Sequence, residues 1–194
     1  MDLKEKELNM KALYNFVSKC SNCPLCQKKT YSVLGEGNIL SEVMFVGEGP
    51  GHDEDLTGRP FVGKAGQLLT KMIEAIGLKR DEVYICNIVK CRPPENRVPA
   101  DDEAKACLPH LRKQVAIIRP KIIVCLGSTA AKYILDPNIK ITKDRGIWHE
   151  KAGVYIIATF HPSALLRDPG KKVPAWEDFK SIKSKLEELG KNNA

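Results

Sequence analysis

The 194-residue sequence contains no long apolar run. Its first residues, MDLKEKELNMKAL, carry a charge at every second or third position, where a secretion signal would be apolar, and no later run approaches the length of a membrane span. We therefore expect a cytoplasmic protein with no membrane partner. In a reducing compartment the seven cysteines are poor disulfide candidates, and better candidates for metal ligands or small core residues.

Acidic residues are also not in excess. Lysine and arginine number 31 against 24 aspartates and glutamates, which gives a net charge of +7. This balance favours a polyanionic partner such as nucleic acid, although a basic surface that only confers solubility explains the charge equally well. A chain of this length buries about 70% of its unfolded surface, so it needs no metal to form a core. We predict one domain over residues 1–194, with 190–194 as a frayed tail.

Four short apolar runs, mostly β-branched and nearly continuous, are bounded by turn residues. Such runs are typical of parallel strands buried on both faces. They lie at Val43–Val46, Val83–Ile88, Ile122–Leu126 and Val154–Phe160. Helical apolar spacing lies between and after them, at 68–76, 104–118, 128–135 and 176–189. The alternation predicts a three-layer α/β/α sandwich with a central parallel sheet of about four strands, whose active site lies at the carboxyl ends of the strands.

The segment GEGPGHDEDLTGRPFVGKAG, residues 47–66, has nearly the spacing of a phosphate-binding loop. Such a loop has Ser or Thr after its lysine to hold magnesium, whereas Ala65 follows Lys64 here. Pro60 lacks the amide that a phosphate would need, and Phe61 is bulky. A dinucleotide-binding reading is weak as well, because Glu54 stands where its final glycine belongs. We expect these glycines to let the backbone approach a flat ligand.

Polar groups follow each of the four predicted strands. Glu48 comes after the first, Asn87 ends the second, Ser128 follows the third and His161 follows the fourth. Singly, each has an ordinary explanation: a turn cap for Asn87, or a histidine that caps a helix. Together at one sheet edge, and with Phe61 nearby, a carboxylate, an amide and an imidazole can bind and activate a nucleobase.

Three motifs, in this order, are highly specific: GEGPG…EDLTGRPFVGKAGQLL, VYICNIVKCRPPENR and HPSALLR. With an upstream CxxCxL they resemble the uracil-DNA glycosylase superfamily, and within it family 4, the iron–sulfur enzymes of archaea and many bacteria. The resemblance covers roughly residues 13 to 167. It implies a hydrolase of base excision repair that flips uracil out of single- or double-stranded DNA, cuts its N-glycosidic bond and leaves an abasic site.

The resemblance also implies roles for single residues. His161 would donate a hydrogen bond to uracil O2 as negative charge grows there, Glu48 would orient the attacking water, and the amide of Gly49 would help to hold the base. Asn87 would accept from N3–H and donate to O4, a pattern that cytosine reverses.

Further expected contacts surround the base. Phe61 would stack on it, and Glu54 would lie near C5, where the methyl group of thymine would clash. The wedge that fills the gap left by the flipped nucleotide would be Leu165, Leu166 and Arg167. The basic residues that could clamp phosphates are Lys64, Lys90, Arg92, Arg97 and Arg167.

The cysteines follow the spacing Cys20-x2-Cys23-x2-Cys26, and then lie at 86, 91, 107 and 125, with no histidine among the first three. An all-thiolate site suits zinc or an iron–sulfur cluster, and spacing does not choose between them. Cys86 and Cys125 lie within apolar runs and are expected to be buried small residues. The family resemblance assigns Cys20, Cys23, Cys91 and Cys107 to a [4Fe–4S] cluster and leaves Cys26 as a bystander or a substitute ligand.

Some features depart from related sequences. His52 stands where relatives often have an acid, and the KRRIH insertion of relatives that trap uracil-DNA covalently is missing. No lysine lies in a lyase motif, so we expect a monofunctional enzyme. The main alternative is a non-catalytic iron–sulfur protein of the same fold that binds DNA or senses uracil. We expect a monomer, and we find no clear motif for a sliding-clamp partner.

Overall fold

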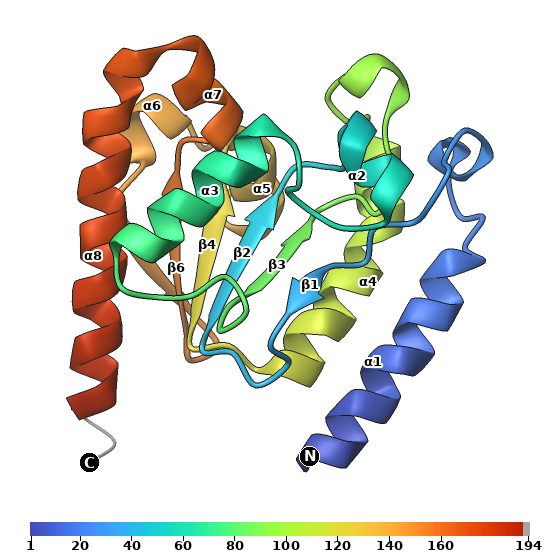
Figure 1. Cartoon of the computed structure of the whole chain (residues 1–194), viewed down its shortest axis with the longest axis horizontal. Helices are drawn as coiled ribbons and strands as arrows, with labels where there is room; N and C mark the ends of the chain where they lie inside the picture. Colours follow the sequence, from blue (N-terminus) through green and yellow to red (C-terminus); the bar gives the residue numbers. More distant parts are fainter. Residues whose placement is uncertain (192–194) are drawn as a thin grey trace.

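The computed structural model describes residues 1–191 and contains a six-stranded sheet in the order β1-β3-β2-β4-β6-β5 (Figure 1). The four central strands are parallel and confirm the four predicted runs. They are β2 (Val43–Gly47), β3 (Tyr84–Asn87), β4 (Ile122–Leu126) and β6 (Val154–Thr159). The edge strands β1 (Glu36–Gly37) and β5 (Trp148–Lys151) are antiparallel and were not predicted. Neither has an apolar run, because each is paired on one side only and is largely exposed.

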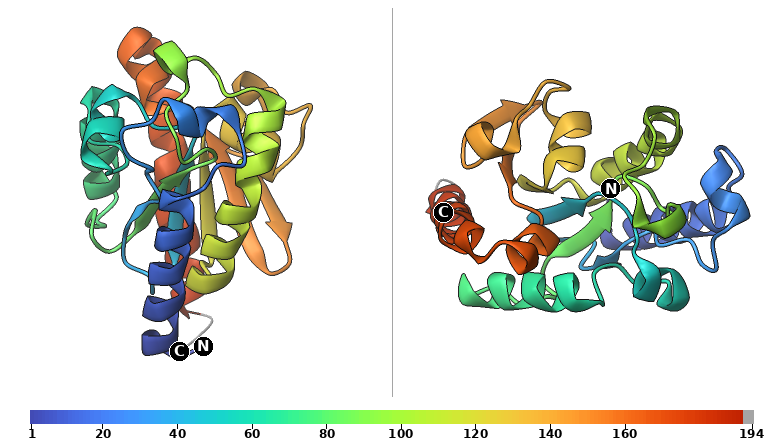
Figure 2. Two further views of the ribbon diagram at one scale, coloured as in Figure 1. Left: turned by 90° about the vertical axis from the view of Figure 1, so that its right-hand side faces the viewer. Right: turned by 90° about the horizontal axis from the view of Figure 1, so that it is seen from above.

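Helices cover both faces of this sheet, so the predicted three layers are confirmed (Figure 2). Alternate residues of one strand enter opposite cores: Phe45 packs with α3 (Lys64–Ala75) and α8 (Lys172–Lys191), and Met44 packs with α4 (Asp101–Ile118) and α5 (Ser128–Ile134). Burial on both sides explains why the runs are continuous. The first helix, α1 (Leu3–Ser18), packs against α4.

Short elements join the layers at the site end. They are η1 (Pro24–Gln27), α2 (His52–Thr57), η2 (Pro94–Asn96), α6 (Ile141–Asp144), α7 (Pro162–Arg167) and η3 (Pro169–Lys171). The final helix extends through Gly190 and Lys191, which were predicted as part of a frayed tail; the remainder of that tail, 192–194, lies outside the described residues. None of the helices described is long and apolar enough to cross a membrane.

The register of the parallel strands decides which loops meet. Gly47 of β2 lies opposite Asn87 of β3, and Leu126 of β4 lies opposite Thr159 of β6. The residues that follow these pairs therefore leave the sheet together at the carboxyl ends of the parallel strands, which Figure 1 places near α2 and α7. A parallel α/β sheet binds its ligands at this edge.

Candidate functional site

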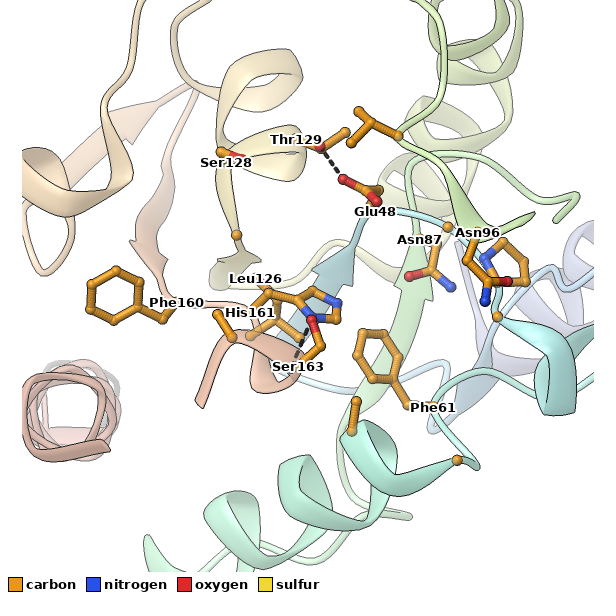
Figure 3. Close-up of a pocket in the computed structure, with 18 of the residues that line it drawn as sticks. Glu48, Phe61, Asn87, Asn96, Leu126, Ser128, Thr129, Phe160, His161 and Ser163 are labelled. Atoms are coloured by element: carbon orange, nitrogen blue, oxygen red, sulfur yellow. Dashed lines mark hydrogen bonds between the residues drawn. The ribbon is translucent and has the colours of Figure 1, made fainter. Parts of the chain in front are cut away.

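A cavity of about 650 Å³ opens at the carboxyl ends of the parallel strands (Figure 3). The predicted base-binding and catalytic residues all line it: Glu48, Gly49, Glu54, Phe61, Asn87 and His161. They come from the segment between β2 and α3, from the last residue of β3 and from the residue that precedes α7, which are far apart in the sequence. The fold therefore gathers the whole predicted set into one cavity.

Asn87 carries an unused hydrogen-bonding group at the bottom of this cavity. The residue is 1% exposed, and its Oδ1 has no hydrogen-bond partner within the described residues. A buried acceptor without a partner costs about 1–3 kcal/mol, so such a group points to a ligand. The space beside it depends on Gly47, because a Cβ there would lie 2.5 Å from Asn87 Oδ1 and 2.5 Å from Phe61 Cζ.

Phe61 forms an aromatic wall of the cavity. Its ring lies 5.6 Å from that of His161, between centroids, at an interplanar angle of 32°. Its backbone has φ = 53°, in the left-handed region that an aromatic residue rarely adopts. The following helix can approach this strained residue because Gly66 has no side chain: a Cβ there would lie 1.8 Å from Phe61 O.

His161 is held as a neutral hydrogen-bond donor. The backbone N–H of Ser163 donates to His161 Nδ1 at 3.2 Å, and Ser163 Oγ lies 2.8 Å from the same nitrogen. Because Nδ1 accepts, the imidazole proton resides on Nε2. Burial, with a smaller effect from the charge of Arg167, lowers the pKa of His161 to about 4. At neutral pH the site thus contains an uncharged imidazole with one N–H available.

Glu48 is fixed by a residue that the sequence analysis missed. The hydroxyl of Thr129, in the first turn of α5, donates to Glu48 Oε2 (Figure 3). The Glu48 carbonyl accepts from the Val89 amide at 3.1 Å, so the main chain is also held. Thr129 and Ser163 both follow strand ends, which was the available signal, but their partners depend on how the loops pack.

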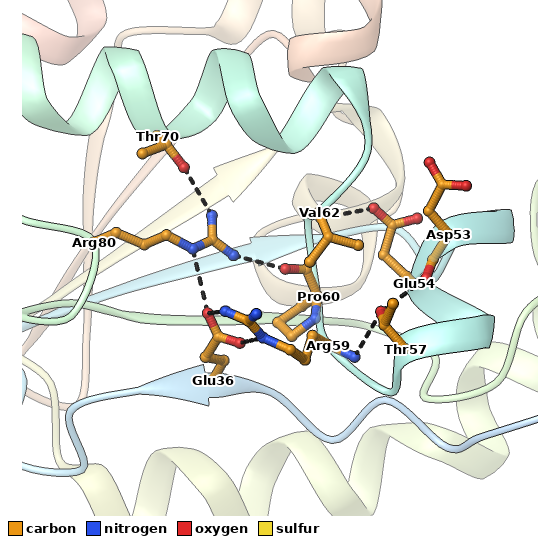
Figure 4. Close-up of polar contacts among 9 residues, drawn as sticks. All are labelled: Glu36, Asp53, Glu54, Thr57, Arg59, Pro60, Val62, Thr70 and Arg80. Atoms are coloured by element: carbon orange, nitrogen blue, oxygen red, sulfur yellow. Dashed lines mark hydrogen bonds and ion pairs between the residues drawn. The ribbon is translucent and has the colours of Figure 1, made fainter.

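Glu54 holds two loops together. Its Oε2 accepts from the Gly51 amide at 3.0 Å, and its Oε1 accepts from the amides of Val62 and Gly63 at 2.9 and 3.0 Å. Figure 4 shows the bond to Val62. Glu54 lines the cavity, which is compatible with its expected position near uracil C5. Its carboxylate oxygens, however, accept hydrogen bonds from the loop that carries Phe61.

Two sequence expectations need correction. Leu165 is 1% exposed and packs in a cluster with Phe160 and Ala175, so it is unavailable as part of a wedge; Leu166 is 47% exposed, and Arg167 lines the cavity. Lys90 is equally buried and does not reach a phosphate at the surface. Its ammonium instead donates to the Asn87 carbonyl at 2.7 Å. Helical and loop position alone did not reveal which way these side chains point.

The other expected basic residues lie nearer to solvent. Lys64 and Arg97 line the cavity, and Arg97 pairs with Glu103 at 2.7 Å. Arg92 is beside Asn96, to which it donates at 2.7 Å, and its Nη1 lies 3.1 Å from His52 Nδ1. His52, which stands where relatives often have an acid, therefore makes an exposed contact with the cation Arg92.

A second, small cavity is lined by five cysteines: Cys20, Cys23, Cys26, Cys91 and Cys107. They come from the segment around η1, the loop after β3 and helix α4, while Cys86 and Cys125 are fully buried in strands, as expected. No group of three or more metal-binding side chains within residues 1–191 stands close enough to hold a single metal ion. A cubane cluster differs from a mononuclear site because each thiolate binds a different iron atom. The donors that the described residues place around the cavity are the five thiols and the imidazole of His110, whose Nε2 lies 3.5 Å from Cys20 Sγ, with no carboxylate; a donor set rich in thiols suits such a cluster.

The sequence model of the uracil DNA glycosylase superfamily matches residues 34–180, which is most of the chain. The chain belongs to the uracil DNA glycosylase superfamily. The resemblance inferred from the motifs is therefore confirmed.

Several members of the superfamily are similar over nearly the whole chain. The type-4 uracil-DNA glycosylase of Thermotoga maritima is 46% identical over 191 residues, covering 95% of this chain and 98% of its own. Those of Sulfurisphaera tokodaii and Archaeoglobus fulgidus are 49% and 45% identical over 176 and 174 residues. These alignments cover 86% of this chain in both cases, and 80% and 87% of the relatives. The similarity to type-4 members confirms the predicted family.

Proposed function

We propose that this protein is a monofunctional uracil-DNA glycosylase, which hydrolyses the N-glycosidic bond of deoxyuridine in DNA and leaves an abasic site for base excision repair. Similarity to type-4 enzymes of that name supports the activity. The observation that carries the proposal for this chain is Asn87 Oδ1, which has no hydrogen-bond partner among residues 1–191 and belongs to a cavity that also contains a neutral His161.

The proposed recognition of uracil rests on donor and acceptor positions. The Asn87 carboxamide accepts from uracil N3–H through Oδ1 and donates to O4 through Nδ2. Cytosine presents an acceptor at N3 and a donor at its exocyclic nitrogen, so it would leave both groups mismatched. The base lies against the ring of Phe61, which is already fixed beside His161 at 5.6 Å between centroids.

Bond cleavage develops positive charge on the sugar and negative charge on the departing uracil. His161 stabilises that anion by donating Nε2–H to O2, from a half-buried position in the cavity where a hydrogen bond to a charge is stronger than in water. Because the imidazole is neutral in the free protein, it keeps the donor in place without the cost of a buried cation. Glu48, held by Thr129, orients the water that attacks the sugar.

DNA binding requires the uridine to leave the base stack. We propose that Leu166 and Arg167 fill the gap, since both are accessible on the first turns after His161. Lys64 and Arg97, at the rim of the cavity, are suited to phosphate contacts, which make binding depend on salt. We further propose that the protein works as a cytoplasmic monomer on single- or double-stranded DNA; no sliding-clamp contact is assigned.

We propose a [4Fe–4S] cluster held by Cys20, Cys23, Cys91 and Cys107, and the clustering of these thiols around one small cavity supports this assignment. Bound there, the cluster would tie the segment after α1 to α4 and to the loop that brings Arg97 to the uracil cavity. The cluster would thus have a structural role. Cys26 lines the same cavity and is a bystander in this assignment.

Replacing Cys91 with serine should abolish the visible absorbance of the cluster and reduce bound iron. Because cofactor binding contributes to folding, the melting temperature should also fall, by about 10 °C if a few kcal/mol are lost. The matched control is Cys26→Ser, in the same cavity, which should keep the iron. Iron analysis and thermal unfolding of both variants provide the measurement. Bound zinc in the wild type, or iron loss in the control, would contradict this assignment.

The activity is tested by incubating the purified protein with an oligonucleotide that contains one uracil, in the presence of a metal chelator, and then heating the product in alkali. A monofunctional glycosylase gives strand scission at the uracil only after alkali. Scission before alkali would indicate a lyase. Tight binding without scission by a protein of full iron content would instead support the non-catalytic, uracil-sensing alternative.

A further inference from the structure

Arg80 lies beside the loop that carries Phe61, and Figure 4 shows its contacts with Glu36, Pro60 and Thr70. It belongs to the loop between α3 and β3 and does not itself line the cavity. Its Nη2 donates to the carbonyl of Pro60 at 2.7 Å, its Nη1 donates to Thr70 Oγ1 at 3.0 Å, and its Nε lies 3.3 Å from Glu36 Oε1. One guanidinium therefore connects the edge strand β1, helix α3 and the residue that precedes Phe61.

The carbonyl that Arg80 binds belongs to the peptide that joins Pro60 to Phe61. The orientation of this peptide helps to set the φ angle of Phe61, which is 53°. Such a conformation persists only where the surroundings determine it. Glu54 holds the next peptide through the Val62 amide at 2.9 Å, so the two peptides that flank Phe61 are fixed by separate side chains.

Arg80 is itself well placed for this role. Its side chain is 20% exposed, so its bond to the Pro60 carbonyl is partly shielded from water. Glu36 is shared with Arg59, which forms bonds of 2.5 and 3.1 Å to it from a more exposed position. Within residues 1–191 the Pro60 carbonyl accepts from Arg80 and not from Arg59, so the two arginines differ in this contact.

We propose that Arg80 is a positioning residue that keeps the Phe61 ring in the orientation against which uracil stacks. The role in stacking rests on the proposed function. Loss of the guanidinium would let the peptide before Phe61 rotate, and the ring would no longer be preorganised for the flipped base. His161 would keep its bonds to Ser163, and Asn87 its bond from Lys90, because within residues 1–191 neither bonds to Arg80 or to Pro60; His161 would lose only its ring contact with Phe61.

The structural part is tested by hydrogen exchange in the ligand-free protein. Arg80→Met should increase the exchange of residues 61–64 well above its level in Arg59→Met, which removes the other cation on Glu36 but leaves the bond to the Pro60 carbonyl. Lys121→Met is a second control, because Lys121 pairs with Glu42 where β2 and β4 begin, at the end of the sheet away from the cavity. Arg80→Lys should give an intermediate increase, since an ammonium cannot make all three contacts. Equal exchange in Arg80→Met and the controls would overturn the proposal.

The functional part is tested by a double-mutant cycle. In single-turnover reactions, Arg80→Met should raise the protein concentration for half-maximal rate by about tenfold or more, and the maximal rate should change much less because His161 keeps its bonds to Ser163. In a Phe61→Ala background the same substitution should have no further effect. A full effect in that background would show that Arg80 acts through something other than Phe61 and would overturn the proposal.

The two parts separate this inference from the proposed function. If the wild type binds uracil-containing DNA but releases no uracil, the proposed function fails, and the cycle is then measured on the dissociation constant for that DNA. Hydrogen exchange needs no activity and decides the structural part in either case. Melting temperatures of all variants identify any general loss of folding, and Arg80→Lys provides a less disruptive substitution if Arg80→Met is unstable.

Discussion

Replacing His161 with alanine should lower the rate of uracil release by about 10²–10³-fold, the range found when one donor to a developing oxyanion is removed. The single-turnover rate constant on a uracil oligonucleotide is the measurement. DNA affinity should change much less, because the bond from Nε2 strengthens mainly in the transition state. The variant also loses the acceptor for the Ser163 amide, so it must be assayed below its melting temperature. His149→Ala, an exposed histidine in β5, is the matched control. A rate within a few-fold of wild type would remove His161 from the mechanism.

The role of His161 also predicts how the rate of uracil release depends on pH. Burial lowers the pKa of His161 to about 4, so the histidine contribution to the rate should be constant through neutral pH and fall only near that value. Protonation of Nδ1 would break its bond from the Ser163 amide. The His161→Ala profile supplies the contribution of other groups. An inflection near the ordinary histidine pKa of about 6.5 would contradict this assignment.

The same pKa shift affects the free energy of unfolding. His161 takes up a proton more readily in the unfolded chain than in the folded one. Its neutral, buried state therefore costs no stability above the unfolded pKa. As the pH falls below about 6.5 the unfolded state is favoured, and the loss continues until the folded pKa near 4 is passed. In denaturant titrations between pH 6.5 and 4, the free energy of unfolding should therefore fall more for the wild type than for His161→Ala.

Replacing Asn87 with alanine should lower kcat/KM for uracil by about 5- to 150-fold and reduce the preference for uracil over cytosine. Two hydrogen bonds to the base would be lost, each worth about 0.5–1.5 kcal/mol between neutral groups, and cytosine would no longer face mismatched partners. The measurement is the rate on matched uracil and cytosine oligonucleotides, with mass spectrometry of the released base. Asn15→Ala, on an exposed position of α1, is the control.

The result for Asn87 also distinguishes recognition from folding. Removal of its buried, unpartnered Oδ1 should leave stability nearly unchanged or slightly higher, because an unsatisfied group disappears with the side chain. Loss of activity with retained stability is the signature of a binding role. Unaltered selectivity in a stable variant would rule out Asn87 as the group that reads the base.

The directions of individual side chains were the feature of the site that the sequence predicted least well. Leu165 and Leu166 are neighbours with the same chemistry, yet one is 1% and the other 47% exposed. Only the packing of α7 against Phe160 and Ala175 distinguishes them. Lys90 likewise follows a strand near the expected DNA face, but its ammonium turns inward to the Asn87 carbonyl.

The sequence by itself determined the four central strands and the groups at their ends. Burial on both faces requires continuous apolar runs, and such runs are local patterns that can be recognised in the sequence. The parallel order of the strands then brings Glu48, Asn87 and His161 to the same end of the sheet. Only the tertiary structure decided which residues hold that set in place. Thr129 is 81 residues from Glu48, and Arg80 is 44 residues from Glu36. Such pairings arise from how separate loops pack, and no local pattern of residues specifies them.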